Sequence, residues 1–256
     1  MKIGHRAMNL GLPMMDAIDA AAEIGYEGVT LCAKEEWIEE GDFPAARARE
    51  VRDYCDERGL TISALTGRLG SMIDEGADER LERALLVVEA ANRLQTPFVT
   101  SHIGVIPEDL DRDDVSAMLR RMDTLCSRAD EMGVTIGVET GPESAEVLRD
   151  FIERLGSERL RVNYDPANLL MNGFDHMGGV EVLAPYIVHT HAKDAVREDP
   201  DGRRQRPLGE GDVDISAWIA ELKRVGFDGW VCVERESGDD KLGDARKALE
   251  LLRGLV

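Results

Sequence analysis

The sequence predicts a xylose-isomerase-like (β/α)₈ TIM barrel, and three observations support the barrel. Apolar, β-branched runs of strand length alternate with amphipathic helical segments along the chain, which is typical of a parallel sheet covered by helices. There are eight such strand–helix pairs, and a glycine separates helix from strand in most of them. The length of 256 residues is close to the roughly 250 residues of a typical barrel. We therefore expect residues 1–256 to form a single barrel domain.

The first four strand–helix pairs extend to residue 133. Each expected strand is short and rich in β-branched residues, and each expected helix has apolar residues at helical spacing. Gly25 and Gly59 end the first two helices, as glycine commonly does at a helix C-terminus. In chain order the expected pairs are residues 2–8 with 13–25, 28–32 with 43–59, 60–66 with 78–95, and 97–104 with 111–133.

The last four pairs repeat the pattern. Strict alternation over eight units favours a closed barrel over a doubly wound sheet. The sixth helix is the weakest of the eight, because its segment is short and interrupted by glycine. In chain order the expected pairs are residues 134–140 with 144–156, 161–165 with 167–173, 187–194 with 214–226, and 230–235 with 244–256.

The composition excludes several classes of partner. The chain has 51 acidic and 31 basic residues, a formal net charge of −20, and this field repels the phosphate backbone of nucleic acids. No apolar run reaches the roughly 20 residues that span a bilayer, and the N-terminus does not resemble a signal peptide. The cysteines are scattered, which indicates free thiols. We expect a cytoplasmic protein with a small-molecule substrate and neither nucleic acid nor membrane as partner.

Four strands in the second half of the chain each end in a potential metal ligand. These residues share a strand face with small or polar side chains, because side chains two apart point the same way. The carboxyl ends of barrel strands meet at one rim, where the active site lies. Three carboxylates and one imidazole at that rim predict a divalent-cation site. The four residues are Glu139, Asp165, His191 and Glu234.

The ligand types suggest both the metal and the reaction. One oxygen-rich site with a single imidazole favours Mn²⁺, with Mg²⁺, Co²⁺ or Zn²⁺ as alternatives. A metal that binds a carbonyl and the adjacent hydroxyl acidifies the carbon-bound proton between them. Glu139 and Glu234, on the fifth and eighth strands, can then exchange that proton. Three carboxylates exceed the charge of a dication by one, which leaves a glutamate free to act as base. This chemistry is enolisation, which leads to isomerisation or epimerisation.

The same residues carry a family resemblance. Together with the run HTHAKD (189–194) and the segment from PLGEGDVD to VCVERE (207–236), they resemble the sugar phosphate isomerase/epimerase family with a xylose-isomerase-like barrel. That family includes ketose 3-epimerases, hydroxypyruvate isomerase, inosose dehydratase and, more distantly, endonuclease IV. The resemblance covers essentially the whole chain. It implies that the four residues bind the metal, that Glu139 and Glu234 act as acid and base through a cis-enediolate, and that the protein is a homodimer or homotetramer.

Four further residues are expected to contact the substrate. Arg197 lies six residues after the metal-binding histidine, where the ketose epimerases place a substrate-binding arginine. Lys193 lies on the ligand face of the seventh strand, and His102 ends the fourth. Asn168 stands where those epimerases have a histidine, and Ala145 where they have a glutamate. These two departures argue against the specific 3-epimerase reaction but do not affect the metal site.

Other functions remain as alternatives. A dehydratase or lyase acting on a keto-inositol or keto-glycoside would use the same site, because proton abstraction is common to both reactions. An endonuclease-IV-like nuclease fits less well, since its zinc cluster is rich in histidine and this acidic chain has five histidines. A non-catalytic sugar-binding protein has no need of two facing glutamates.

A basic cluster stands out in this acidic chain. Arg203, Arg204 and Arg206 lie in the long connection that follows the seventh strand. Charged residues are mostly exposed, so we interpret the cluster as a solvated loop tip. The alternative is a mobile lid that binds a phosphate or a carboxylate.

Overall fold

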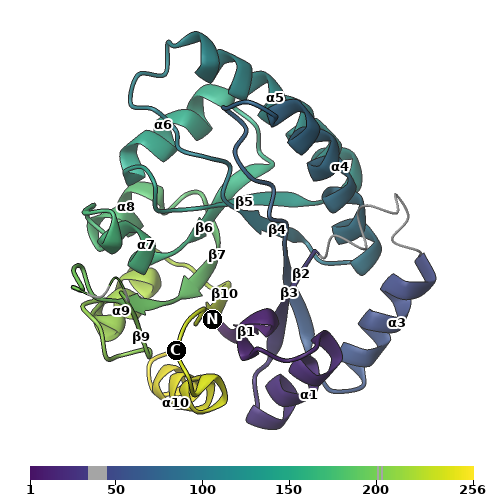
Figure 1. The fold of residues 1–256 in the computed structure, drawn as a ribbon, viewed down its shortest axis with the longest axis vertical. Coiled ribbons are helices and arrows are strands. Elements are labelled where there is room, and N and C mark those ends of the chain that lie inside the picture. The colour runs from purple at the N-terminus through teal and green to yellow at the C-terminus, as the bar shows by residue number, and fades with distance from the viewer. Residues whose placement is uncertain (34–44, 201, 203) are drawn as a thin grey trace.

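Eight parallel strands close into a barrel, which confirms the expected fold class (Figure 1). The structure is a computed structural model that describes residues 1–33, 45–200, 202 and 204–256. Around the barrel the order is β1-β10-β7-β6-β5-β4-β3-β2, so strands of successive units are neighbours. The strands are β1 Lys2–Arg6, β2 Gly28–Cys32, β3 Thr61–Thr66, β4 Phe98–Ser101, β5 Thr135–Glu139, β6 Leu160–Tyr164, β7 Ile187–Ala192 and β10 Trp230–Val233.

Helices surround the barrel and bury their apolar faces against it (Figure 1). Local sequence sets their ends: the Ser144 side chain accepts a hydrogen bond from the Val147 N–H at the start of α6, and Gly156 ends that helix with φ 70°. None of the described helices is long and apolar enough to cross a membrane. The helices are η1 Ala7–Leu10, α1 Met14–Ile24, α3 Ala45–Asp56, α4 Ala77–Leu94, α5 Asp113–Met132, α6 Ala145–Leu155, α7 Pro166–Met171, α8 Gly178–Leu183, α9 Ile215–Arg224 and α10 Lys241–Arg253.

Two glycines, Gly4 on β1 and Gly28 on β2, leave room for atoms of other strands that lie close to them. A Cβ atom on Gly28 of β2 would lie 2.6 Å from the Trp230 ring and 2.7 Å from the Thr61 carbonyl oxygen. A Cβ atom on Gly4 of β1 would lie 2.6 Å from the Cys232 sulfur. These contacts are too short for any side chain, so both positions require glycine.

The connections after β6 and β7 differ from the expected pattern. The sixth crossover contains two short helices, α7 and α8, where one was expected. The connection after β7 contains an antiparallel hairpin, β8 Asp194–Ala195 with β9 Gln205–Arg206, which the alternation does not predict. The segment that follows β9 is held by the Asp194 carboxylate, which accepts hydrogen bonds from the backbone N–H groups of Gly209, Gly211 and Val213. This hairpin stands at the barrel rim beside the strand ends.

Candidate metal centre

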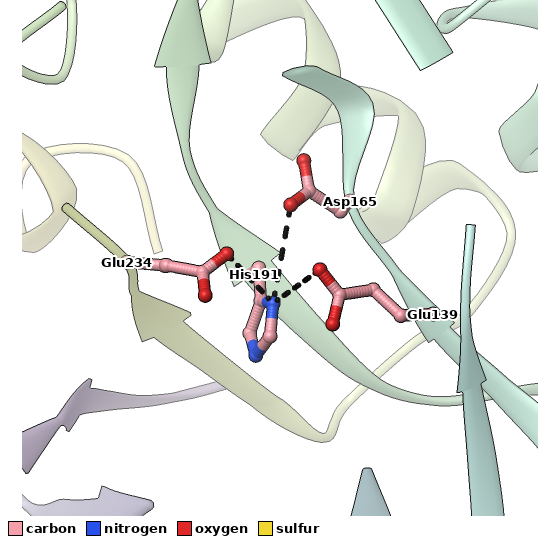
Figure 2. A group of neighbouring side chains, drawn as sticks. All are labelled: Glu139, Asp165, His191 and Glu234. Atoms are coloured by element: carbon pink, nitrogen blue, oxygen red, sulfur yellow. Dashed lines mark ion pairs between the residues drawn. The ribbon is translucent and has the colours of Figure 1, made fainter. Parts of the chain in front are cut away.

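The four expected ligands converge at the carboxyl ends of four adjacent strands, β5, β6, β7 and β10 (Figure 2). One ligand atom from each lies within 4.8 Å of the others, and all four residues are buried. The Nδ1 atom of His191 lies 3.5 Å from Glu139 Oε1, 3.9 Å from Asp165 Oδ2 and 3.2 Å from Glu234 Oε2. In Figure 2 the two glutamates lie on opposite sides of the imidazole.

Asp165 shows that this cluster fits a cation. Its Oδ1 atom caps α7 by accepting a hydrogen bond from the Asn168 N–H at 3.0 Å. Its Oδ2 atom is buried and accepts no hydrogen bond from the described residues. Burial raises the pKa of Asp165 to about 7. A buried carboxylate oxygen without a donor is costly, and a metal ion would satisfy it.

His191 and Glu234 shift each other's pKa values strongly. Burial lowers the pKa of His191, but the carboxylates of Glu234 and Glu139 outweigh burial and raise that pKa well above its usual value. Burial raises the pKa of Glu234, yet His191, Lys193 and Arg6 bring it well below its usual value. Without a metal, the imidazolium of His191 therefore supplies positive charge among the carboxylates.

Two buried cations contact Glu234, and one of them is absent from the sequence prediction. Arg6, the last residue of β1, donates from Nη1 to Glu234 Oε1. Lys193 Nζ lies 3.2 Å from Glu234 Oε2 and 3.5 Å from Asp165 Oδ2. Both cations also contact Glu236, at 3.5 Å from Arg6 and 3.3 Å from Lys193. Four carboxylates, a dication and two cations would together be neutral, so Arg6 and Lys193 offset the negative surplus of the ligands.

Glu139 contacts an amide and an imidazole on its outer side. The amide Nδ2 of Asn168 donates to Glu139 Oε1 at 2.9 Å, and His102 Nε2 lies 3.5 Å from the same oxygen. Asn168 Oδ1 also accepts a hydrogen bond from Lys193 Nζ at 3.1 Å. His102 and Asn168 line a cavity of about 330 Å³ with Val105 and Pro142. Of the expected substrate contacts, His102, Asn168 and Lys193 thus lie beside the cluster.

Arg197 is placed differently from the other expected substrate contacts. It is exposed, and its backbone N–H donates to Asp212 Oδ2 at 2.8 Å. Its side chain makes no ion pair or hydrogen bond with the described residues, and it is not brought to the cluster. The hairpin β8–β9 begins between His191 and Arg197 and changes the direction of the chain there. The spacing of six residues after His191 therefore does not predict where the Arg197 side chain lies.

A buried hydrogen-bonded layer supports His191 from below. His189 lies two residues earlier on β7, and its Nδ1 atom lies 2.8 Å from Asn163 Oδ1. The Asn163 amide nitrogen lies 3.3 Å from His191 Nε2. Cys232 Sγ lies 3.2 Å from His189 Nε2, and burial lowers the pKa of His189 to about 3. His189 is therefore a neutral interior histidine and orients the ligand above it.

Glu143 is a buried acid outside the cluster, and it yields a stability prediction. Its Oε2 atom accepts a hydrogen bond from the Ile106 N–H at 3.2 Å, and burial raises its pKa from 4.5 to about 7. The folded state therefore keeps this proton up to about pH 7, whereas the unfolded state releases it near pH 4.5. The proton on Glu143 therefore stabilises the folded state fully below about pH 4.5. This contribution to the free energy of unfolding is lost as the pH rises through the folded-state pKa of about 7.

We expect Glu143→Gln to be more stable than the wild type at pH 8 by up to about 3 kcal/mol. At pH 4 the difference should nearly vanish, because the wild-type carboxyl is then neutral in both states. Urea unfolding of both proteins at the two pH values measures the effect. Equal differences at pH 4 and pH 8 would contradict an ionisation penalty at this residue.

Comparison with known proteins identifies the family. A family model described as "Xylose isomerase-like TIM barrel" matches residues 18–255. The chain therefore belongs to the xylose isomerase-like TIM barrel family, as the sequence resemblance implied.

Individual relatives are distant but cover much of the chain. A xylose isomerase domain protein from Planctomyces limnophilus has a crystal structure with TM-score 0.84 and 27% identity, covering 93% of this chain and 91% of that one. A putative hydroxypyruvate isomerase from Streptomyces coelicolor is 23% identical over 253 residues, 90% of this chain and 88% of that protein. An uncharacterized protein from Methanocaldococcus jannaschii is 26% identical over 179 residues, 65% of this chain. The inosose dehydratase from Geobacillus thermodenitrificans is 22% identical over 172 residues, 60% of this chain. The match spans only 58% and 57% of the length of the last two.

Proposed function

We propose that the protein is a divalent-metal-dependent isomerase or epimerase that acts on a sugar or sugar phosphate. The observation that carries this proposal is the pair of buried glutamates on opposite sides of one imidazole (Figure 2). Two carboxylates that flank a single site can remove a proton from one position of a bound α-hydroxy ketone and return it at another. The family includes isomerases, epimerases and dehydratases, which supports an enzyme of this general kind.

Glu139 and Glu234 would act as the acid/base pair through a cis-enediolate. Glu139 has a neutral amide and an imidazole on its outer side, so its carboxylate can accept a carbon-bound proton. Glu234 is held by cations on both of its oxygens, which fixes its orientation for the second proton transfer. Asn168 and Lys193 would donate hydrogen bonds to substrate oxygens, and the positive charge of Lys193 would stabilise the developing enediolate.

Glu139, Asp165, His191 and Glu234 would hold one metal ion, with Mn²⁺ as the proposed metal and Mg²⁺, Co²⁺ or Zn²⁺ as alternatives. When bound, the ion would bind the carbonyl and hydroxyl oxygens of the substrate and acidify the proton between them. We also propose that the enzyme acts in cytoplasmic carbohydrate metabolism as a homodimer or homotetramer, as the family resemblance suggests.

Deuterium exchange tests this proposal directly. The protein would be incubated in D₂O with a panel of ketoses, ketose phosphates and keto-inositols, with Mn²⁺ or with EDTA, and observed by NMR. We expect exchange at one carbon of at least one compound, and only with the metal. Exchange that persists in EDTA would contradict the metal mechanism. Bound metal with no exchange in any compound would argue against enolisation.

Elimination of water or a glycosyl leaving group is the second candidate. Lys193 supports it, because an ammonium group 3.2 Å from Glu234 could hydrogen-bond a departing oxygen and stabilise the negative charge that develops on it. The two candidates differ in the mass of the product. Isomerisation and epimerisation conserve the substrate mass, whereas elimination lowers it by one water or one leaving group.

A further inference from the structure

A second and larger cavity lies on the Glu234 side of the centre. Its volume is about 820 Å³, within the range of small-molecule sites. The end of α7, the β8–β9 hairpin and the loop after β10 form its walls. The residues that line it include Met171, Arg204, Gln205, Arg206, Arg235 and Ser237.

Three guanidinium groups face this cavity, whereas Asp239 is the one acidic residue among the described residues of its lining. Arg235 Nε donates to Asp244 at 3.1 Å, and Arg206 forms an ion pair with Asp199. Arg204 differs from both, because its Nη1 atom donates to the Met171 carbonyl oxygen at 2.6 Å. No carboxylate of the described residues forms an ion pair with Arg204.

The structure therefore changes the interpretation of the basic cluster. Arg204 and Arg206 are partly buried and line a cavity, so they do not form a solvated loop tip. Arg203 lies outside the described residues. In a chain with a net charge of −20, three arginines line one cavity; carboxylates pair with Arg206 and Arg235, so Arg204 is the group that would attract an anion.

A row of side chains connects this cavity to the metal centre. Gln205, in the cavity wall, donates from Nε2 to Glu236 Oε2 at 2.7 Å. Lys193 Nζ lies 3.3 Å from that same oxygen and 3.2 Å from Glu234 Oε2. One shared carboxylate thus links the cavity wall to a lysine at the centre.

The cavity on the other side of the centre has a different character. Among the residues that the structure describes, the lining beside Glu139 contains His102 and Asn168 but neither lysine nor arginine. The basic residues near the centre are thus concentrated on the Glu234 side, where Arg6 and Lys193 also lie. This asymmetry would orient a substrate that is charged at one end.

We propose that the larger cavity binds an oxyanion group of the substrate, either a phosphoryl group or a carboxylate. This inference rests on the proposed function for the position of the reacting carbonyl. Guanidinium groups bind both anions through charge-assisted hydrogen bonds, which favours them over neutral hydroxyl groups. The substrate is then an acidic sugar derivative, with its reacting carbons at the metal and its anionic end near Arg204.

Binding of inorganic phosphate tests the cavity without turnover. The full chain, loaded with Mn²⁺ or treated with EDTA, would be titrated by calorimetry at constant ionic strength. We expect saturable binding in both forms and an affinity lowered at least about tenfold in Arg204→Gln, the effect of losing a hydrogen bond to a charged group. Arg149→Gln is the matched control, since Arg149 pairs with Asp150 on α6 and lies outside the cavity lining. Binding that disappears with EDTA, or that is equal in Arg204→Gln and the wild type, would overturn the proposal.

The exchange assay then distinguishes the two anions and separates this proposal from the proposed function. Neutral ketoses, ketose phosphates and keto sugars with a terminal carboxylate would be compared. We expect one anionic class to have the highest kcat/KM, and Arg204→Gln to raise KM for that class more than it lowers kcat. Equal kcat/KM for neutral and anionic ketoses would overturn the anion site and leave the metal-dependent enolisation intact. Phosphate binding without exchange in any compound would support the anion site and contradict the proposed function.

Discussion

Replacing Glu234 by glutamine is expected to lower proton exchange at the substrate carbon by about 10²- to 10⁴-fold, the range that general acid–base catalysis contributes. Glutamine has nearly the same shape and keeps one oxygen for the metal, but it cannot carry the proton. In the wild type, Arg6 contacts Oε1 while Lys193 and His191 contact Oε2, so the carboxylate is already oriented. The exchange rate by NMR, together with metal binding by calorimetry, measures the two effects separately.

Glu236→Gln is the matched control for this experiment. Glu236 contacts Arg6 and Lys193 as Glu234 does, at 3.5 and 3.3 Å, but its side chain is 48% exposed. It lies outside the four-residue cluster. This variant removes a neighbouring negative charge and should keep most of the exchange activity. A Glu234→Gln enzyme that retains bound metal and exchanges protons at nearly the wild-type rate would exclude the two-glutamate mechanism.

The sequence predicts the barrel and the metal cluster because both depend on local patterns that repeat. A strand end is visible from the alternation of side chains, and a parallel barrel brings all strand ends to one rim. Asp165 follows its strand directly and Glu139 is the last residue of β5, so neither depends on loop geometry. Asn168 also follows from local structure, because it lies in the first turn of a helix that Asp165 caps.

Residues that reach the site through tertiary packing are harder to predict. Arg6 lies 228 positions before Glu234 in the chain, and one arginine after a short strand carries no distinguishing pattern. Only the closure of the barrel, with β1 beside β10, brings the two together. The β8–β9 hairpin has two-residue strands, too short for any periodicity, although it removes Arg197 from the cluster and places Arg204 in a cavity wall. Arg6 adds a positive charge beside the ligand carboxylates, which the sequence prediction did not include.

Metal binding is expected to strengthen by about tenfold per pH unit near neutrality, because each metal ion that binds must displace a proton from His191. The carboxylates of Glu234 and Glu139 raise the pKa of His191 well above its usual value, so the metal-free imidazole keeps its proton at pH 7. Lowering the pH should weaken binding further, because the pKa of Asp165 is raised to about 7 by burial and a second proton then competes.

Calorimetric titration with Mn²⁺, in two buffers of different ionisation enthalpy, counts the protons released. We expect about one proton per metal ion above pH 7 and more than one below it. His191→Gln is the informative variant, because it removes the imidazole proton and should flatten the pH dependence above pH 7 while weakening binding. The same affinity at pH 6 and pH 8 in the wild type, with no proton release, would mean that the metal does not bind through His191. The metal would then bind to the carboxylates alone. The proposal that a His191 imidazolium balances the carboxylate charge in the metal-free cluster would also be wrong.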